Sequence, residues 1–352
     1  MTTITIAGRP IGHDHPTYIV AELSANHGQS IDKARAIITA AKDAGADAVK
    51  LQTYTPSTMT IASDQPWFRI EGTIWHGRQL HELYGDAYTP WEWHAPLKAH
   101  AESLGLPLFS TPFDATAVDF LESLSVPAHK IASFELVDLP LLERVAATAK
   151  PVIMSTGMAT LDEIEEAVEV LRRGDCRDLV LLKCTSAYPA PAGEMDLRTI
   201  PDLANRFGVV VGLSDHSMGV AVPVAAVTLG ARVIEKHLTL SRSDPGPDSA
   251  FSLEPGEFRA MVDAVRQCEE ALGTIRYGPT PREIPTRVFR RSLFVVAEVA
   301  AGEAFTPDNV RVIRPAHGLP PRHYRGIIGR RAATRISPGT PLAWELVEGG
   351  LS

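Results

Sequence analysis

Short apolar runs alternate along this chain with segments whose apolar residues recur at helical spacing. Residues 18–23 form the first such run and are typical of a buried strand. The segment after it predicts a helix that ends at Gly45, with apolar positions at Ala34, Ile37, Ile38, Ala41 and Ala44. The repeating pattern predicts further strands at 48–52, 106–110, 128–132, 152–155, 179–183, 209–213 and 232–234, with helices between them and a last helix over 255–272.

Three of the predicted helices carry capping signals at their starts. Thr89 is expected to be an N-cap, with Pro90 at the first helical position and Glu92 completing a capping box. Asp114 is expected to cap the helix that follows the third strand. The segment Thr160-Leu161-Asp162-Glu163 predicts another capping box.

The number and spacing of these units indicate the fold class. Eight strand-and-helix units within roughly 275 residues have the size and rhythm of a (β/α)8 TIM barrel, an α/β fold. Short strands that are apolar throughout are typical of a parallel sheet covered on both faces. A doubly wound open sheet is the structural alternative.

Composition narrows the class of protein further. The chain has 352 residues, 45% of them hydrophobic and 22% charged, which is typical of a soluble globular protein. Its net charge of −8 and its scattered basic residues argue against nucleic acid or an anionic membrane as the main partner. The longest apolar run, 220–229, is too short to span a bilayer, and the N-terminus shows no secretion signal. Three cysteines without metal-ligand spacing fit reduced thiols, so we expect a cytoplasmic protein.

Two histidines end neighbouring predicted strands. His216 follows the strand at 209–213, and His237 follows the strand at 232–234. If these strands are parallel and adjacent, both imidazoles face one mouth of the sheet, where a divalent ion joins them and keeps open positions for substrate. Mn²⁺ or Mg²⁺ would suit such a site. The alternative is that each histidine only makes a local hydrogen bond at the end of its strand.

The other strand ends are polar as well. They carry Glu22, Lys50, Gln52, Thr111, Lys130, Ser133, Glu135, Ser155, Lys183, Ser186, Tyr188 and Ser214. In a barrel these positions meet at the C-terminal face, where the chemistry of this fold takes place. Lysines that converge with hydroxyl groups indicate a small anion with phosphate or carboxylate groups, and two glutamates offer proton transfer. Neither nucleotide-binding glycine motif is present, so a nucleotide phosphate is not expected.

Seven ordered motifs resemble those of the sialic acid synthase (NeuB) family, and the resemblance covers essentially the whole chain. They are AELSANH at 21–27, VKLQTY at 49–54, STPFD at 110–114, KIAS at 130–133, STGM at 155–158, LSDHS at 213–217 and EKH at 235–237. The resemblance implies an enzyme that condenses phosphoenolpyruvate with an N-acetylated amino sugar. It also implies a catalytic barrel over 1–278, a proline-containing linker over 279–289 and a small antifreeze-like (SAF, β-clip) domain over 290–352.

An insert after the second strand indicates a branch of that family. Residues 72–78, 83–84 and 87–94 resemble the branch that makes pseudaminic acid, whose sugar is 2,4-diacetamido-2,4,6-trideoxy-L-altrose. Aromatic side chains suit the methyl and acetamido groups of that sugar. The alternative is that Trp91 and Trp93 only anchor the helix they begin. Synthesis of N-acetylneuraminate or legionaminate remains open, as does a non-catalytic sugar-binding protein.

The resemblance also implies roles for individual residues. The catalytic residues would be Glu22, Glu135, His216 and His237, of which the two histidines would hold the divalent metal. Phosphoenolpyruvate would contact Lys50, Thr111, Lys130, Ser133, Ser155, Ser186 and Ser214. The sugar would contact Glu22, Gln52, Tyr188, Asp248 and Arg314. Arg314 would come from the partner subunit of a domain-swapped homodimer. One departure puts a phosphate contact in doubt, because Ser186 stands where the family commonly has Asn.

Overall fold

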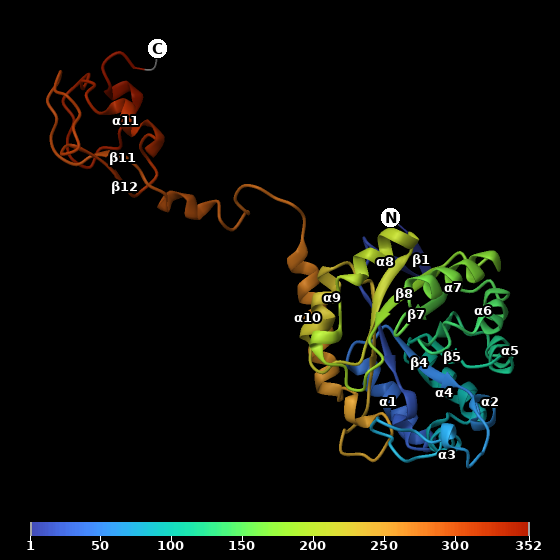
Figure 1. Cartoon of the computed structure of the whole chain (residues 1–352). Helices are drawn as coiled ribbons and strands as arrows, with labels where there is room; N and C mark the ends of the chain where they lie inside the picture. Colours follow the sequence, from blue (N-terminus) through green and yellow to red (C-terminus); the bar gives the residue numbers. More distant parts are fainter. Residues whose placement is uncertain (1, 351–352) are drawn as a thin grey trace. The chain divides into compact units, whose positions relative to one another are not determined.

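The chain divides into two compact units, Met1–Gly273 and Thr274–Ser352 (Figure 1). A computed structural model describes residues 2–350. The segment 279–289, which was expected to be a linker, lies in the second unit and contains the short helix η5 (Pro285–Phe289).

Eight parallel strands of the first unit close into a barrel. The last strand pairs with both the first strand and its own predecessor, which leaves no sheet edge open. The predicted (β/α)8 barrel is therefore confirmed, and the open doubly wound sheet is excluded. The strands are β3 (Tyr18–Glu22), β4 (Ala48–Thr53), β5 (Leu108–Pro112), β6 (His129–Ile131), β7 (Val152–Ser155), β8 (Leu179–Cys184), β9 (Val210–Asp215) and β10 (Val233–His237).

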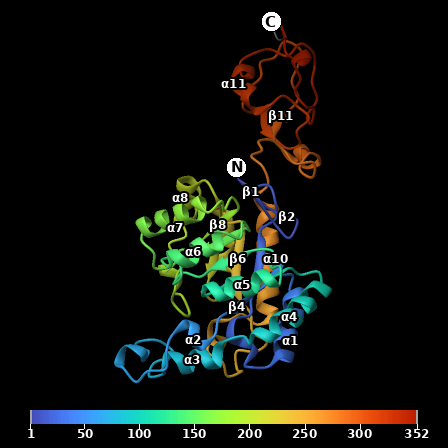
Figure 2. The ribbon, with the colours of Figure 1, turned by 90° about the vertical axis from the view of Figure 1, so that its right-hand side faces the viewer.

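Helices surround this barrel (Figure 2). The main ones are α1 (Ile31–Asp43), α4 (Trp91–Ser103), α5 (Ala115–Ser123), α6 (Leu139–Ala146), α7 (Leu161–Arg173), α8 (Thr199–Phe207), α9 (Ala221–Thr228) and α10 (Pro255–Leu272). Shorter pieces lie in the loops: α2 (Pro56–Met59), α3 (Leu80–Ala87), η1 (Ser24–His27), η2 (Pro66–Phe68), η3 (Ala192–Glu194) and η4 (Ser249–Phe251). Among the described residues, no helix is both long and apolar enough to cross a bilayer.

Two of the three predicted caps are confirmed. The Asp114 carboxylate accepts from the backbone at the start of α5, and Thr160 and Glu163 form the capping box of α7. The prediction for Thr89 was wrong, because α4 begins at Trp91 with Pro90 as N-cap and without a side-chain cap. Thr89 is buried instead, and its hydroxyl oxygen lies 3.2 Å from His27 Nε2.

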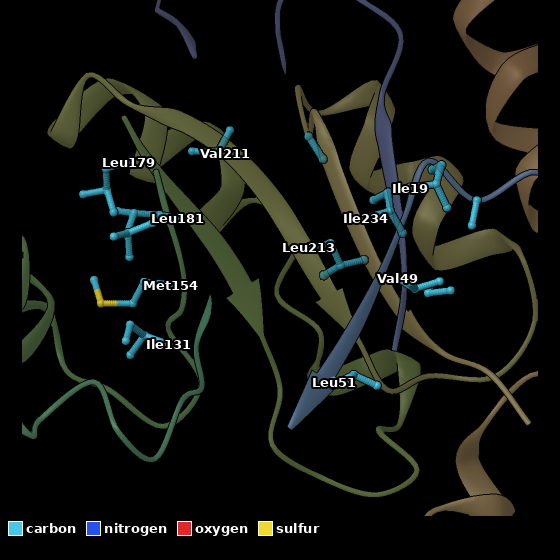
Figure 3. Packing of buried hydrophobic residues seen from close by; sticks show 14 of the residues in the cluster. Ile19, Val49, Leu51, Ile131, Met154, Leu179, Leu181, Val211, Leu213 and Ile234 are labelled. Carbon is cyan, nitrogen blue, oxygen red and sulfur yellow. The ribbon is translucent and has the colours of Figure 1, made fainter. Parts of the chain in front are cut away.

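The outward side chains of the strands form the main hydrophobic core with the helices. Ile19, Val49, Met154, Leu181 and Ile234 are fully buried in this layer (Figure 3). Successive side chains of a strand point to opposite faces, so the intervening residues face the barrel interior.

A hairpin that the sequence pattern did not predict packs against the interior of the barrel. It consists of β1 (Thr3–Ile6) and β2 (Arg9–Gly12), which pair in antiparallel fashion. Its Ile4, Ile6 and Ile11 are buried in one cluster with inward residues from the first halves of the strands. Each isoleucine contributes roughly 1.5–3 kcal/mol by leaving water.

In three strands the inward positions change from apolar to charged or polar toward the C-terminal end. In β3 Val20 precedes Glu22, and in β10 Val233 precedes Glu235 and His237. In β4 Ala48 is followed by Lys50 and Gln52. The N-terminal half of the barrel is therefore sealed by apolar packing, and the chemistry is confined to its C-terminal end.

The second unit has a core of its own. Its sheet pairs β11 (Ser292–Val295) with β12 (Val310–Ile313), and isolated bridges such as Val299 to Ile336 add further pairing. The remaining elements are η6 (Pro321–His323), α11 (Tyr324–Ile327) and η7 (Trp344–Leu346). Ten apolar residues, among them Leu293, Phe305 and Leu342, are buried together.

Candidate active site

A cavity of about 460 Å³ lies at the C-terminal ends of the barrel strands. It collects side chains from strands and loops that are far apart in the sequence. The predicted site residues that line it are Lys50, Gln52, Lys130, Ser133, Glu135, Ser155, Tyr188, Ser214, His216, His237 and Asp248.

The two histidines lie side by side in this cavity. Their ring centroids are 5.3 Å apart, and the rings are inclined by 61°. His216 Nδ1 donates to the carbonyl oxygen of Thr185 at 3.0 Å, and His237 Nδ1 lies 3.2 Å from Ser24 Oγ. Because both rings use Nδ1 in this way, Nε2 of each remains available for a ligand.

This pair fits an exchangeable divalent cation better than a structural one. Among residues 2–350, no cluster of three or more His, Cys, Asp or Glu side chains is arranged to hold a metal. A cation here would have two protein ligands and would take the others from water or substrate. Burial lowers the pKa of His237 well below its usual value, and His216 and Lys50 lower it further. His237 is therefore neutral near pH 7, which is the form that binds metals.

Lys50, Lys130 and Glu235 form the floor of the cavity, and the buried Glu22 contacts Lys50. Glu235 Oε1 lies 3.3 Å from Lys50 Nζ and 3.7 Å from Lys130 Nζ. Lys50 Nζ also lies 2.8 Å from Glu22 Oε2 and donates to Thr111 Oγ1 at 3.1 Å. Burial opposes ionisation of Glu235, but the charges of Lys130 and Lys50 outweigh it and lower its pKa. The pairing allows these four charges to remain buried.

Hydroxyl groups surround the lysines. Lys130 Nζ donates to Ser155 Oγ at 2.7 Å, and Ser214 Oγ donates to Glu235 Oε1 at 3.3 Å. The Gly157 backbone N–H donates to Ser133 Oγ at 3.0 Å. The cavity floor therefore presents ammonium and hydroxyl donors to a small anion.

Glu22, Thr111 and Ser186 are not among the residues that line the cavity. Glu22 is fully buried, and its Oε1 accepts from Gln52 Nε2 at 3.2 Å. Burial raises the pKa of Glu22, and the charge of Lys50 opposes that rise. Thr111 lies behind Lys50 and accepts from it. Ser186 lies beside Gly157. A β-carbon added to Gly157 would collide with the Ser186 hydroxyl.

Glu135 is the cavity carboxyl group suited to proton transfer near neutral pH. Burial raises its pKa to about 7, and the positive charge of Lys130 opposes this rise. Its Oε2 is buried and forms no hydrogen bond with the described residues. A group with this pKa exchanges a proton efficiently at neutral pH.

The segment between β4 and α4 forms an apolar wall of the cavity. Two contacts hold Trp75 in place. Its Nε1 donates to the Pro247 carbonyl at 3.1 Å, and its ring centroid lies 5.8 Å from that of Tyr188. The other residues that this segment contributes to the lining are Tyr54, Met59, Ile70, Thr73, Leu80, Leu83, Tyr84 and Ala87.

Trp91 and Trp93 do not line the cavity. Trp91 stacks on Phe120 with ring centroids 4.6 Å apart, and its Nε1 donates to the Tyr54 carbonyl. Trp93 packs edge-on against His27 at 5.6 Å. Both therefore anchor α4, as the alternative interpretation held.

Four residues of the site were missed by the sequence analysis. Glu235 stands two residues before His237, and this spacing on one strand was the signal that both face inward. Phe251 packs against His237 with ring centroids 5.0 Å apart, and the Ser24 hydroxyl contacts the same imidazole. The thiol of Cys184 lies 3.9 Å from His216 Nδ1. These last three contacts arise from loops or from a neighbouring strand, so local sequence carried no signal for them.

Arg314 lies in the second unit, in an exposed position directly after β12. Its predicted contact with the sugar site stays a prediction.

The fold and the cavity together define the class of protein. Buried cationic groups, a carboxyl group that titrates near neutral pH and a wall of aromatic side chains meet at the catalytic end of a closed barrel. This combination is that of a TIM-barrel enzyme for small anionic substrates.

The chain belongs to the NeuB family. The model of that family matches residues 37–277, and the SAF domain model matches residues 290–348. The chain is 46% identical to the pseudaminic acid synthase of Helicobacter pylori, with 96% of this chain and 99% of the relative covered. It is also 46% identical to the pseudaminic acid synthase of Campylobacter jejuni subsp. jejuni serotype O:23/36, with 94% and 96% covered.

More distant relatives are similar over most of their length too. Identity to the N,N'-diacetyllegionaminic acid synthase of Legionella pneumophila is 35%, with 97% of each chain covered. A crystal structure of N-acetylneuraminic acid (sialic acid) synthetase from Leptospira borgpetersenii in complex with citrate superposes with a TM-score of 0.72. That match has 30% identity and covers 81% of this chain and 95% of the other.

Proposed function

We propose that this protein is a pseudaminic acid synthase. It would condense phosphoenolpyruvate with 2,4-diacetamido-2,4,6-trideoxy-L-altrose and water, and release pseudaminic acid and phosphate. The observation that carries the proposal is the cavity itself, which is lined by buried lysines, by a pair of imidazoles and by an apolar wall with aromatic side chains. The identity of 46% to two pseudaminic acid synthases, against 35% to a legionaminic acid synthase, supports this branch of the family.

Phosphoenolpyruvate carries a phosphate and a carboxylate, and the cavity floor supplies donors for both. Lys50 and Lys130 provide the charge, and the hydroxyl groups of Ser133, Ser155 and Ser214 provide further hydrogen bonds. Thr111 supports this arrangement by accepting from Lys50. Ser186 lies at the edge of this group, beside Gly157, and would contact the phosphate.

The sugar would bind between the polar and the apolar walls. Gln52, Tyr188 and Asp248 line the cavity and offer hydrogen bonds to hydroxyl and acetamido groups. Trp75 and Leu83 offer apolar surface for the methyl group and the acetyl methyls. Glu22 would act by orienting Gln52 and Lys50, since both contact it.

The reaction forms one carbon–carbon bond and exchanges one carbon–oxygen bond, because the oxygen of water replaces the phosphate oxygen at C2. The enol π electrons of phosphoenolpyruvate bond C3 to the aldehyde carbon, and the aldehyde oxygen takes the negative charge and then a proton. Water adds at C2 and loses a proton to Glu135, whose pKa of about 7 suits a general base. The resulting tetrahedral carbon expels phosphate and leaves the ketone.

His216 and His237 would hold Mn²⁺ or Mg²⁺ through Nε2. Such a cation, when bound, supplies Lewis-acid polarisation of the aldehyde oxygen.

The active form would be a domain-swapped homodimer, in which Arg314 reaches the sugar site of the other protomer. The charge of the two units supports an association between them. Residues 274–352 contain 12 Arg, no Lys and 6 acidic residues, whereas residues 1–273 contain 22 basic and 36 acidic residues. The free thiols of Cys176, Cys184 and Cys268 fit a cytoplasmic enzyme.

An assay with each sugar tests this function. The full-length protein is incubated with phosphoenolpyruvate, Mn²⁺ and one sugar at a time, and phosphate release and product mass are measured. We expect turnover with the altrose derivative. Turnover with N-acetylmannosamine alone, or with the legionaminic acid precursor alone, would assign the chain to another branch. A lack of phosphate release with every sugar, together with sugar binding, would support a non-catalytic protein.

A further inference from the structure

Ser24 adopts a backbone conformation that is unfavourable for residues with a β-carbon. It lies two residues after the end of β3, is buried, and has a φ of +42°. This left-handed region costs a residue with a β-carbon about 1–2 kcal/mol. Such conformations persist where surrounding contacts impose them, and they concentrate at functional sites.

Glu22 and His237 contact Ser24, and Asp248 contacts its neighbour Ala25. The Ser24 backbone N–H donates to Glu22 Oε1 at 2.9 Å, and the Ser24 hydroxyl oxygen lies 3.2 Å from His237 Nδ1. Asp248 accepts from the neighbouring Ala25 N–H at 3.3 Å. Ser24 therefore links residues that we assign to the cation and to the sugar.

The contact with Ser24 is compatible with a cation on the other nitrogen of the ring. A neutral imidazole that binds a cation through Nε2 carries its proton on Nδ1. The Ser24 oxygen lies at Nδ1 of His237 and can accept that proton. When His216 is neutral its ring has the same form, because its Nδ1 faces the Thr185 carbonyl, which only accepts.

We infer that Ser24 is a positioning residue whose hydroxyl accepts from His237 Nδ1 and so leaves the Nε2 lone pair of His237 for a cation. This inference rests on the proposed function, since it presupposes a cation held by His216 and His237. The backbone N–H of Ser24 plays a separate part, because it orients Glu22 and would survive any substitution except proline.

Two substitutions separate the hydroxyl from the backbone strain. Ser24→Ala and Ser24→Gly both remove the hydroxyl and keep the N–H. Only Gly also relieves the positive φ. If the role of Ser24 were purely structural, Ser24→Gly would be at least as good as the natural residue in every measurement.

The experiment measures Mn²⁺ binding to the full-length protein without substrates, by the loss of the free-ion electron paramagnetic resonance signal. We expect His237→Ala to abolish binding. Ser24→Ala and Ser24→Gly should each weaken it about 10- to 100-fold, as loss of a hydrogen bond to a metal-binding histidine typically does. Thermal unfolding of the same samples shows whether each variant is folded.

The possible results are distinguishable. The role of Ser24 would be overturned, and the cation site left intact, if Ser24→Gly bound Mn²⁺ with the affinity of the natural protein while His237→Ala bound none. Failure of the natural protein to bind Mn²⁺, or unchanged binding by His237→Ala, would overturn the proposed cation site and this inference with it.

Discussion

Asp215 and Lys236 form a fully buried ion pair of 2.7 Å between β9 and β10. The two residues are direct partners in the strand register, and each precedes one of the paired histidines. Asp215 Oδ1 also accepts from the Ser217 backbone N–H at 2.9 Å and from its hydroxyl at 2.7 Å. The ion pair therefore joins the two strand ends on the face opposite to the cavity.

Removing one partner of this pair should destabilise the barrel strongly. Lys236→Met leaves the Asp215 charge buried without its partner, which typically costs about 3–5 kcal/mol. Urea unfolding followed by circular dichroism measures the loss. The double variant Asp215→Asn with Lys236→Met should recover part of the stability, because no buried charge remains. Equal losses in the single and double variants would contradict this explanation.

The pH dependence of the reaction should report on Glu135. As a base it must be ionised, so kcat/KM should rise with pH through about 7, where the pKa of Glu135 lies. Glu135→Gln should lower kcat about 10²- to 10⁴-fold, the usual contribution of a general base. The remaining activity should lose that rise with pH. A Gln variant that retains the natural pH profile would assign the base elsewhere.

The free energy of unfolding should also depend on the ionisation of Glu135, but it should fall as the pH rises. Burial raises the folded-state pKa of Glu135 above the unfolded value, so the neutral form is favoured by folding. Its stabilising contribution is complete below about pH 4.5 and is lost as the pH rises through about 7. Glu135→Gln should therefore match the natural protein at pH 5 and exceed its free energy of unfolding at pH 8, by about 1–3 kcal/mol. Urea unfolding at both pH values tests this, and an equal effect at both would contradict it.

Features set by local sequence were predictable, and features set by tertiary contacts were not. The barrel followed from the repeat of apolar strands and amphipathic helices, and the caps at Asp114 and Thr160 need only their own helix. The Thr89 prediction failed because His27, 62 residues earlier in the chain, lies against that hydroxyl. A capping motif does not reveal such a competitor.

The same distinction applies to the site. Lys50, Lys130 and the two histidines were recognisable because each is a polar residue within or directly after an apolar strand, and such residues gather at the C-terminal end of a barrel. Glu235 was missed, although its spacing from His237 indicated an inward position, because its contacts with Lys50 and Lys130 reach strands that are not its neighbours in the sheet. The strain at Ser24 is a backbone property that no residue pattern encodes.

Chelation should remove activity reversibly. A cation with only two protein ligands exchanges readily, so EDTA should abolish phosphate release and added Mn²⁺ should restore it. His216→Ala should leave the protein inactive at any Mn²⁺ concentration that restores the natural enzyme. Full activity in EDTA after exhaustive dialysis would contradict a role for the cation.

Replacing Trp75 should weaken binding of the sugar and leave the affinity for phosphoenolpyruvate nearly unchanged. Its ring lies in the apolar wall, and its Nε1 donates to the Pro247 carbonyl on the opposite loop. Trp75→Ala should raise the KM for the altrose derivative about 10- to 200-fold, as expected for the loss of about 1–3 kcal/mol of apolar contact. Trp75→Phe keeps an aromatic ring and should cause a smaller rise.

Trp91→Phe is the matched control, because Trp91 makes the same kind of indole-to-carbonyl hydrogen bond but packs on Phe120 outside the cavity. It should lower the melting temperature without changing either KM, since its contacts hold α4 and not the substrate. Steady-state kinetics with each substrate varied in turn separates the two tryptophans. A KM for phosphoenolpyruvate that rises as much as that for the sugar in Trp75→Ala would mean that the apolar wall organises the whole cavity rather than the sugar subsite.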